Sequence, residues 1–184
     1  RGQMDGFRST VSSTLRAILF LSVPATVGLI MLRVPLIQVL LERGAFDARS
    51  TQWVAAALGF YALGLAGHSA VEILSRAFYA LHDTIRPVAV GLSAMALNII
   101  LSLILGRPIE SGGMAHAGLA LANSIATLLE MIVLWVLLTR KAEGMPWREV
   151  GLSALRILAA SAVMGIVLWS FLYYLGGASP WFAA

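Results

Sequence analysis

Long apolar runs separated by short polar stretches dominate the chain. Five runs are long enough to cross the roughly 30 Å hydrocarbon core of a bilayer as helices of about 20 residues. They cover about 15–41, 50–71, 87–106, 117–139 and 157–177. Lipid offers no hydrogen-bond partner to a free backbone group, and the runs are too long for barrel strands. The pattern therefore predicts an all-α integral membrane protein with about five transmembrane helices in a single membrane domain over 1–184.

The segment 145–156 between the last two runs has a mixed pattern. Pro146 can begin a helix, Trp147 suits a membrane interface, and apolar residues alternate with charged ones up to Arg156. This pattern predicts a short helix lying on the cytoplasmic surface of the membrane.

Composition agrees with a membrane protein. Apolar residues make up 59% of the chain and charged residues 12%, and mean hydropathy is +0.86, whereas soluble domains carry roughly twice that charged fraction. The chain has no Cys, which excludes disulfides and thiolate chemistry. The net charge of +4 bears on membrane orientation more than on nucleic acid, which we do not expect as a partner.

Catalytic patterns do not appear in the sequence. The three histidines, at 68, 82 and 116, lie in separate regions, and no metalloprotease, nucleophile-elbow or phosphate-loop motif is present. We therefore expect no enzyme. Because the chain begins at Arg1 rather than Met, we also expect it to be part of a longer protein.

Basic residues fall unevenly on the two sides of the five predicted spans. One side receives Arg1, Arg8, Arg16, Arg76, Arg86, Arg140, Lys141, Arg148 and Arg156, and the other receives Arg43, Arg49 and Arg107. Positive charge favours cytoplasmic loops. The sequence therefore predicts a cytoplasmic N-terminus.

The stretch 73–88 places basic and aromatic residues between the second and third runs, on the predicted cytoplasmic side. Its candidate hinge and anchor residues are Arg76, Tyr79, Asp83 and Arg86. If the second helix continues beyond the membrane, Glu72 and Arg76 become neighbours four residues apart, as do Tyr79 and Asp83. Two interpretations stay open: a loop that only sets orientation, or a functional hinge.

Polar groups inside the runs are candidates for a cavity or a cation site. They are Asn98, Ser102, Asn123 and Glu130. Neutral oxygens could ligate a cation, or the same groups could form interhelical hydrogen bonds worth about 1 kcal/mol each. An acid within a span is a functional candidate by default, and a protonated, hydrogen-bonded Glu130 is the competing interpretation. We expect His68 to be a packing residue and Arg33 to extend toward the outer interface.

Prolines and glycines interrupt several runs. The first run contains Pro24, Gly28 and Pro35, and the second contains Gly59, Gly64 and Gly67. Such residues allow helices to bend and to approach closely in lipid. They fit either static packing or a bundle that moves, as in a transporter.

Several stretches together resemble one known family. They are LSVPATVGLIML (21–32), LLERGAFDARST (40–51), FYALGL (60–65), LSRAFYALHDTIRPV (74–88) and GLALANS (118–124). In this order they resemble the C-terminal lobe of the MurJ/MviN lipid II flippases, within the wider superfamily of multidrug and polysaccharide exporters. The resemblance implies a two-lobe transporter of fourteen helices, of which the five runs would be about the ninth to thirteenth.

The same resemblance implies a function and partners. Family members move undecaprenyl-diphosphate-linked peptidoglycan precursor across the bacterial inner membrane, and the implied partners are that lipid, membrane lipids and the N-terminal lobe of the same protein. No cofactor is implied, and coupling to Na⁺ or to the membrane potential stays open. Asn98 matches the amide of a family sodium site, Ser102 stands where an acid is expected, and Asn123 stands where Thr is expected. Glu130 matches no family motif. The alternatives are an exporter of polysaccharide lipids or drugs, or a membrane scaffold without transport.

Overall fold

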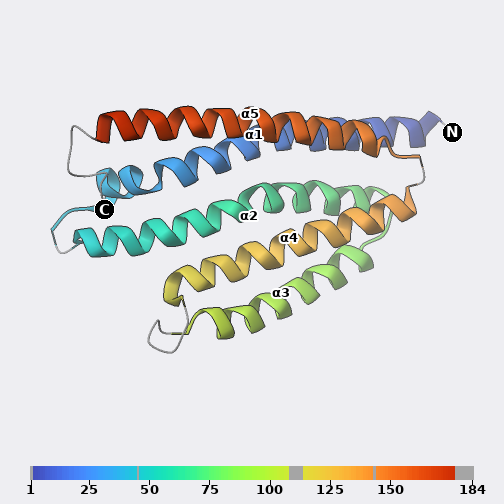
Figure 1. The fold of residues 1–184 in the computed structure, drawn as a ribbon. Coiled ribbons are helices and arrows are strands. Elements are labelled where there is room, and N and C mark those ends of the chain that lie inside the picture. The colour runs from blue at the N-terminus through green and yellow to red at the C-terminus, as the bar shows by residue number, and fades with distance from the viewer. Residues whose placement is uncertain (1, 45, 108–113, 143, 177–184) are drawn as a thin grey trace.

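The computed structural model describes residues 2–44, 46–107, 114–142 and 144–176, and the described chain consists of five long helices (Figure 1). They are α1 (Gly2–Leu41), α2 (Ala48–Ala80), α3 (Ile85–Leu105), α4 (Ala115–Lys141) and α5 (Trp147–Gly176). Each contains an apolar window long enough to cross a membrane. The expected all-α membrane fold is confirmed.

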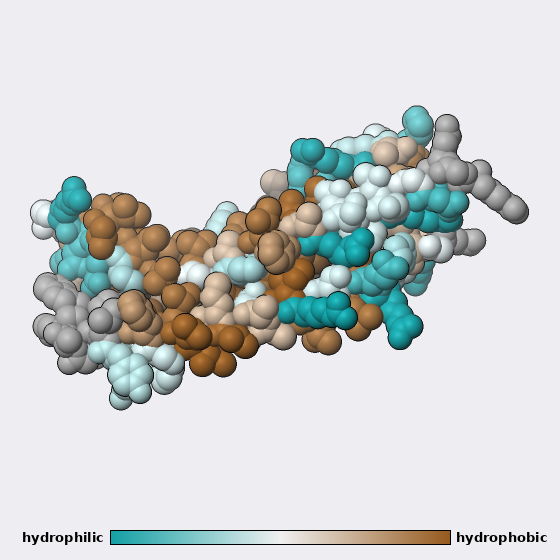
Figure 2. All heavy atoms as spheres, turned by 90° about the horizontal axis from the view of Figure 1, so that it is seen from above, coloured by the Kyte–Doolittle hydropathy of each residue, from teal (hydrophilic) through white to brown (hydrophobic). Residues whose placement is uncertain are grey.

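The helices form a row in which sequence neighbours are not always spatial neighbours. Figure 1 shows the order α5, α1, α2, α4, α3, and packing contacts join each helix to the next in that order. Many large apolar side chains on the outer surfaces of α3 and α5 are exposed, including Leu103, Ile166 and Trp169. In Figure 2, hydrophilic side chains gather toward the two ends of the molecule and apolar ones lie between them, the pattern expected of a membrane band.

The structure corrects the prediction of a separate surface helix over 145–156. Trp147 begins α5, which continues without a break through this segment to Gly176. No proline lies between Trp147 and Gly176 to interrupt the helix. Val150 is buried and the Trp147 ring lies 4.4 Å from the Trp135 ring, so the first turns of α5 dock on the protein instead of lying alone on a membrane surface.

Large buried side chains fill the end of the bundle where α1 begins and α2 and α4 end. We call this cluster the Phe78 core; its fully buried large members are Leu15, Leu74, Phe78, Leu134 and Leu138. Burying a side chain of this size contributes roughly 1.5–3 kcal/mol in water, and close packing supplies the corresponding contacts in lipid. This core ties α1, α2 and α4 together at one end.

Small residues join α2 to α4 farther along. We call this contact the glycine seam; it consists of Gly64 and Gly67 against Ser124, Thr127 and Leu128. A Cβ at Gly64 would lie 2.8 Å from Ser124 Oγ and 3.1 Å from Ser124 Cα. The Ser124 hydroxyl donates a hydrogen bond of 2.6 Å to the backbone oxygen of Phe60. The absence of a side chain at Gly64 therefore lets the two backbones approach closely.

Candidate functional site

A chain of polar side chains crosses three helices along the seam of α2, α3 and α4. Ser102 Oγ donates to Asn98 Oδ1 at 3.2 Å, and Asn98 Nδ2 donates to Asn123 Oδ1 at 3.5 Å. Asn123 Nδ2 lies 3.1 Å from His68 Nε2, and Thr127 Oγ1 lies 3.2 Å from the same nitrogen. We call these five residues the polar chain. The structure thus brings together three of the four predicted residues of the candidate cation or cavity site.

The direction of the hydrogen bonds sets the tautomer of His68. The Asn123 side-chain nitrogen can only donate, so His68 Nε2 accepts in this contact and the ring proton lies on Nδ1. His68 is exposed on the surface of the described chain and stacks on Tyr61 with ring centroids 6.4 Å apart. The polar chain therefore opens onto one face of the row.

The donor set of the polar chain does not fit a strong sodium site. Hard cations take oxygen ligands and favour carboxylates, but Asn98, Ser102 and Asn123 supply only neutral oxygens. The oxygens of Asn98 and Asn123 already accept hydrogen bonds within the chain. Among the described residues, no three His, Asp or Glu side chains gather where they could hold a metal ion.

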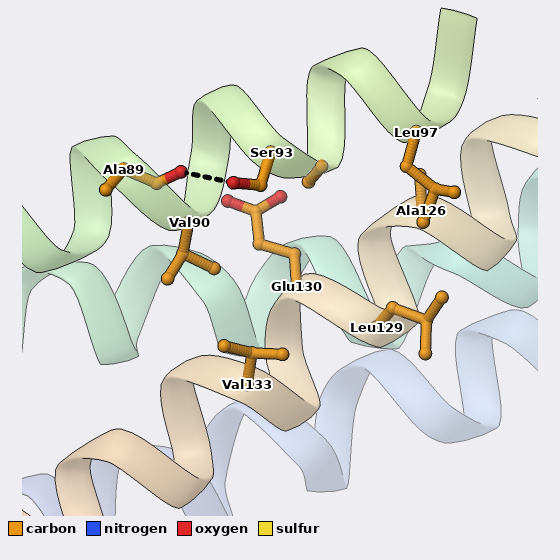
Figure 3. Close-up of a pocket in the computed structure, with 9 residues that line it drawn as sticks. Ala89, Val90, Ser93, Leu97, Ala126, Leu129, Glu130 and Val133 are labelled. Atoms are coloured by element: carbon orange, nitrogen blue, oxygen red, sulfur yellow. Dashed lines mark hydrogen bonds between the residues drawn. The ribbon is translucent and has the colours of Figure 1, made fainter. Parts of the chain in front are cut away.

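Glu130 lies apart from the polar chain, in a pocket of about 250 Å³ between α3 and α4. Figure 3 shows its carboxyl group reaching from α4 toward α3, close to Ser93, among apolar side chains. Ser93 Oγ donates to the backbone oxygen of Ala89 at 2.9 Å. Glu130 Oε1 would lie 3.4 Å from a Cβ at Gly91, so the glycine gives the carboxyl group room. Glu130 is the only ionisable group among the lining residues.

The two polar features occupy different levels of the same helix. Glu130 follows Asn123 by seven residues on α4, which is about two helical turns, so both side chains face nearly the same direction about 10 Å apart. The seam of α3 and α4 therefore carries a hydrogen-bonded amide pair at one level and a single carboxyl group at the other.

Asp83 links the connection between α2 and α3 to the end of α4. Its Oδ2 accepts from Lys141 Nζ and lies 3.2 Å from Arg86 Nη1, and its Oδ1 accepts from the Arg86 backbone N–H at 3.3 Å. The hydrogen bond from Lys141 is the largest cause that lowers the pKa of the Asp83 carboxyl below its usual value. We call Asp83, Arg86 and Lys141 the Asp83 joint.

The structure separates the four predicted anchor residues. Asp83 and Arg86 meet in the Asp83 joint, whereas Arg76 pairs with Glu72 at 2.6 Å, as the spacing predicted. The predicted pairing of Tyr79 with Asp83 is wrong. Helix α2 ends at Ala80, so the four-residue helical spacing does not reach Asp83, and the Tyr79 side chain is exposed.

Sequence reasoning missed three members of these sites. Lys141 lies 58 residues from Asp83, and only the meeting of the end of α4 with the loop after α2 brings them together. The sequence predicted His68 as a packing residue and did not indicate Thr127 as part of a site. A signal existed for Thr127, which lies four residues after Asn123 on the same helical face.

Comparison with known proteins assigns the family. The family model described as "Lipid II flippase MurJ" matches residues 1–178. The chain belongs to the MurJ family. It is 36% identical to a probable lipid II flippase MurJ of Rhizobium tropici over 155 residues, which are 84% of this chain and 28% of that protein. It is 32% identical to a probable MurJ of Vibrio cholerae over 166 residues, 90% of this chain and 31% of that one.

A solved MurJ structure has the same arrangement of helices. The structure titled "Lipid II flippase MurJ, inward closed conformation" superposes with a TM-score of 0.75 at 29% identity, covering 89% of this chain and 32% of that one. The chain thus spans about three-tenths of the length of its MurJ relatives. The five helices are part of the larger two-lobe helical fold expected from the sequence.

Proposed function

We propose that this chain is part of a transporter that moves lipid II across the bacterial inner membrane by alternating access. The observation that carries the proposal is the match to the lipid II flippase MurJ family over residues 1–178. The substrate would be the undecaprenyl-diphosphate-linked peptidoglycan precursor, and the partners would be membrane lipids and the remaining lobe of the same protein.

The physical chemistry of the substrate supports this role. A diphosphate sugar headgroup cannot cross about 30 Å of hydrocarbon unaided, because its charges and hydroxyls would lose their hydration. A polar path between helices can carry the headgroup while the lipid tail stays in the membrane. Helices joined through small residues, such as those of the glycine seam, can shift relative to one another with little steric cost.

The orientation belongs to the same proposal. The Asp83 joint and the basic residues near the start of α1 lie at the same end of the molecule, and the excess of positive charge there supports a cytoplasmic location for it. Cysteine labelling of intact cells tests this: a cysteine at position 82 should be protected from a membrane-impermeant reagent, and one at position 47 should react. The reverse pattern would overturn the orientation.

A depletion experiment tests the function. The complete gene should support growth of a bacterium whose own lipid II flippase is depleted, with expression checked by immunoblot. Failure to rescue at normal protein levels would contradict lipid II as the substrate and would favour a related exporter of polysaccharide lipids or drugs.

Substitutions in the polar chain and at Glu130 separate transport from a scaffold role. In the complete protein, Asn98→Leu, Asn123→Leu and Glu130→Leu should each lower lipid II translocation into vesicles, while the exposed apolar change Leu103→Val should leave it unchanged. Unchanged translocation in all three variants would assign these residues to packing alone.

A further inference from the structure

Arg33 places a positive charge inside a membrane-crossing helix. It lies eight residues before the end of α1 at Leu41, about 12 Å along the helix axis. Its guanidinium rests against Gly59 of α2, where an added Cβ would lie 3.0 Å from Arg33 Nη1 and 3.1 Å from Cδ. Gly59 itself lies eleven residues after the start of α2, about 16 Å along that helix.

This position corrects the expectation that Arg33 extends to the outer interface. A side chain that lies against Gly59 stays within the span, because both contact points are more than two helical turns from the outer helix ends. The residue is nevertheless exposed on the described chain, so its charge faces outward from the seam of α1 and α2. Ionised groups at this depth face a water-filled cavity or an oppositely charged partner.

No acidic partner for Arg33 appears among the described residues. The ion pairs of the described chain involve Arg8, Arg16, Arg76, Arg86 and Lys141, and none of the side-chain hydrogen bonds between described residues involves Arg33. The other ionisable groups deep within the described spans include His68 and Glu130. His68 lies within hydrogen-bond distance of Asn123 and Thr127 of α4, and Glu130 sits between α3 and α4, on the far side of α2 from α1. The guanidinium carries five N–H donors, and no described acidic side chain pairs with it.

We propose that Arg33, held in place against Gly59, is a phosphate-binding residue for the diphosphate group of the transported lipid. This inference rests on the proposed function and adds a substrate contact in the outer half of the membrane. A planar guanidinium binds phosphate oxygens through two parallel hydrogen bonds, a geometry that an ammonium group does not reproduce. Gly59 contributes by its lack of a side chain, which leaves the space that the guanidinium occupies.

The test measures lipid binding to the complete protein in nanodiscs by native mass spectrometry. The probes are undecaprenyl diphosphate and undecaprenol, which has the same tail without phosphate. Arg33→Gln should bind the diphosphate lipid about tenfold more weakly and undecaprenol unchanged, since one charge-assisted phosphate contact is lost. Arg33→Lys should bind the diphosphate lipid about threefold more weakly, because the positive charge remains but the two parallel hydrogen bonds do not.

Two matched controls isolate charge from position. Arg43→Gln removes an exposed arginine from the outer connection and should leave diphosphate binding unchanged. Gly59→Leu should weaken diphosphate binding by displacing the guanidinium, whereas Gly28→Leu, at a glycine with nothing within 4 Å, should not.

The outcomes separate this inference from the proposed function. If the wild-type protein binds the diphosphate lipid and translocates lipid II while Arg33→Gln does so equally well, the inference is overturned and the proposed function stands. If Arg33→Gln weakens the binding of both lipids equally, the inference is also overturned. Arg33 would then stabilise the fold, for example by pairing with an acid elsewhere in the complete protein. If the wild-type protein binds neither lipid, both proposals fall.

Discussion

The two contacts between α2 and α4 are built in opposite ways. In the Phe78 core, large apolar side chains interlock and are fully buried. In the glycine seam, the backbones approach so closely that a single methyl group at Gly64 would meet Ser124. The first kind of contact resists movement because every large side chain fits one arrangement. The second presents a smooth surface with few interlocking groups, and the polar chain lies beside it. The difference suggests a fixed end and a region able to shift.

The largest expected effect comes from the Phe78 core. Phe78→Ala should destabilise the complete protein by about 3–5 kcal/mol, because it leaves a cavity among fully buried neighbours. The neighbouring change Tyr79→Ala removes a side chain that is 48% exposed and should cost far less. Thermal unfolding in detergent, followed by tryptophan fluorescence, measures both. Equal losses would show that the core is not the fixed end.

A smaller effect is expected at the glycine seam. Gly64→Ala should destabilise by about 1–3 kcal/mol, since the new methyl group forces α2 and α4 apart. Gly28→Ala makes the same change in open space within α1 and should be neutral or slightly stabilising, as expected for alanine in a helix. The same unfolding assay compares the two. If Gly64→Ala left the free energy of unfolding unchanged, α2 and α4 would not be in close contact at the glycine seam.

The Asp83 joint gives a pH-dependent effect. Because the pKa of Asp83 is lowered in the folded protein, its ionised form adds stability at neutral pH, and that contribution is lost as the pH falls through the lowered pKa. The melting temperature of the wild type should therefore exceed that of Asp83→Asn at pH 7. The difference should begin to fall near the ordinary aspartate pKa of about 4 and should vanish only below the lowered pKa of the folded protein. Asp5→Asn, in the exposed pair with Arg8, should show a smaller difference at pH 7. If the difference in melting temperature between the wild type and Asp83→Asn did not change with pH, it would not come from the ion pairs of Asp83.

The smallest effect is expected in the turn before α3. His82 has a φ of +55°, in the left-handed region where Asn is enriched among non-glycine residues. His82→Asn should stabilise by about 0.5 kcal/mol without altering translocation. Chemical denaturation of the two proteins measures the difference. Destabilisation would show that the imidazole makes a contact worth more than the backbone strain.

Local sequence patterns predicted the helices but not the contacts between segments distant in the sequence. Apolar runs located all five helices, and spacing along one helix gave the Glu72–Arg76 pair. The Asp83–Lys141 pair joins residues 58 positions apart, which no local spacing encodes. The surface helix was mispredicted because an amphipathic pattern looks alike whether its apolar face meets lipid or the ends of neighbouring helices.

The same distinction applies to the candidate site, where local spacing predicted one contact and helix packing determines the others. Asn98 and Ser102, one turn apart on α3, were recognisable as neighbours from spacing alone. Their junction with Asn123 and His68 depends on how α3, α4 and α2 pack, so the sequence could not reveal it. The sequence predicted Glu130 as a candidate because it is an acid within a span, but only the structure shows that it lies apart from Asn98 and Asn123.

The end of α3 and the start of α4, opposite the Asp83 joint, are fastened to each other. The Met114 N–H donates to the Leu105 carbonyl oxygen at 2.8 Å, and Gly118 packs directly on the Leu105 backbone. Because main-chain atoms join them, these two helix ends move together as one unit, and any side chain at position 118 would have to part them.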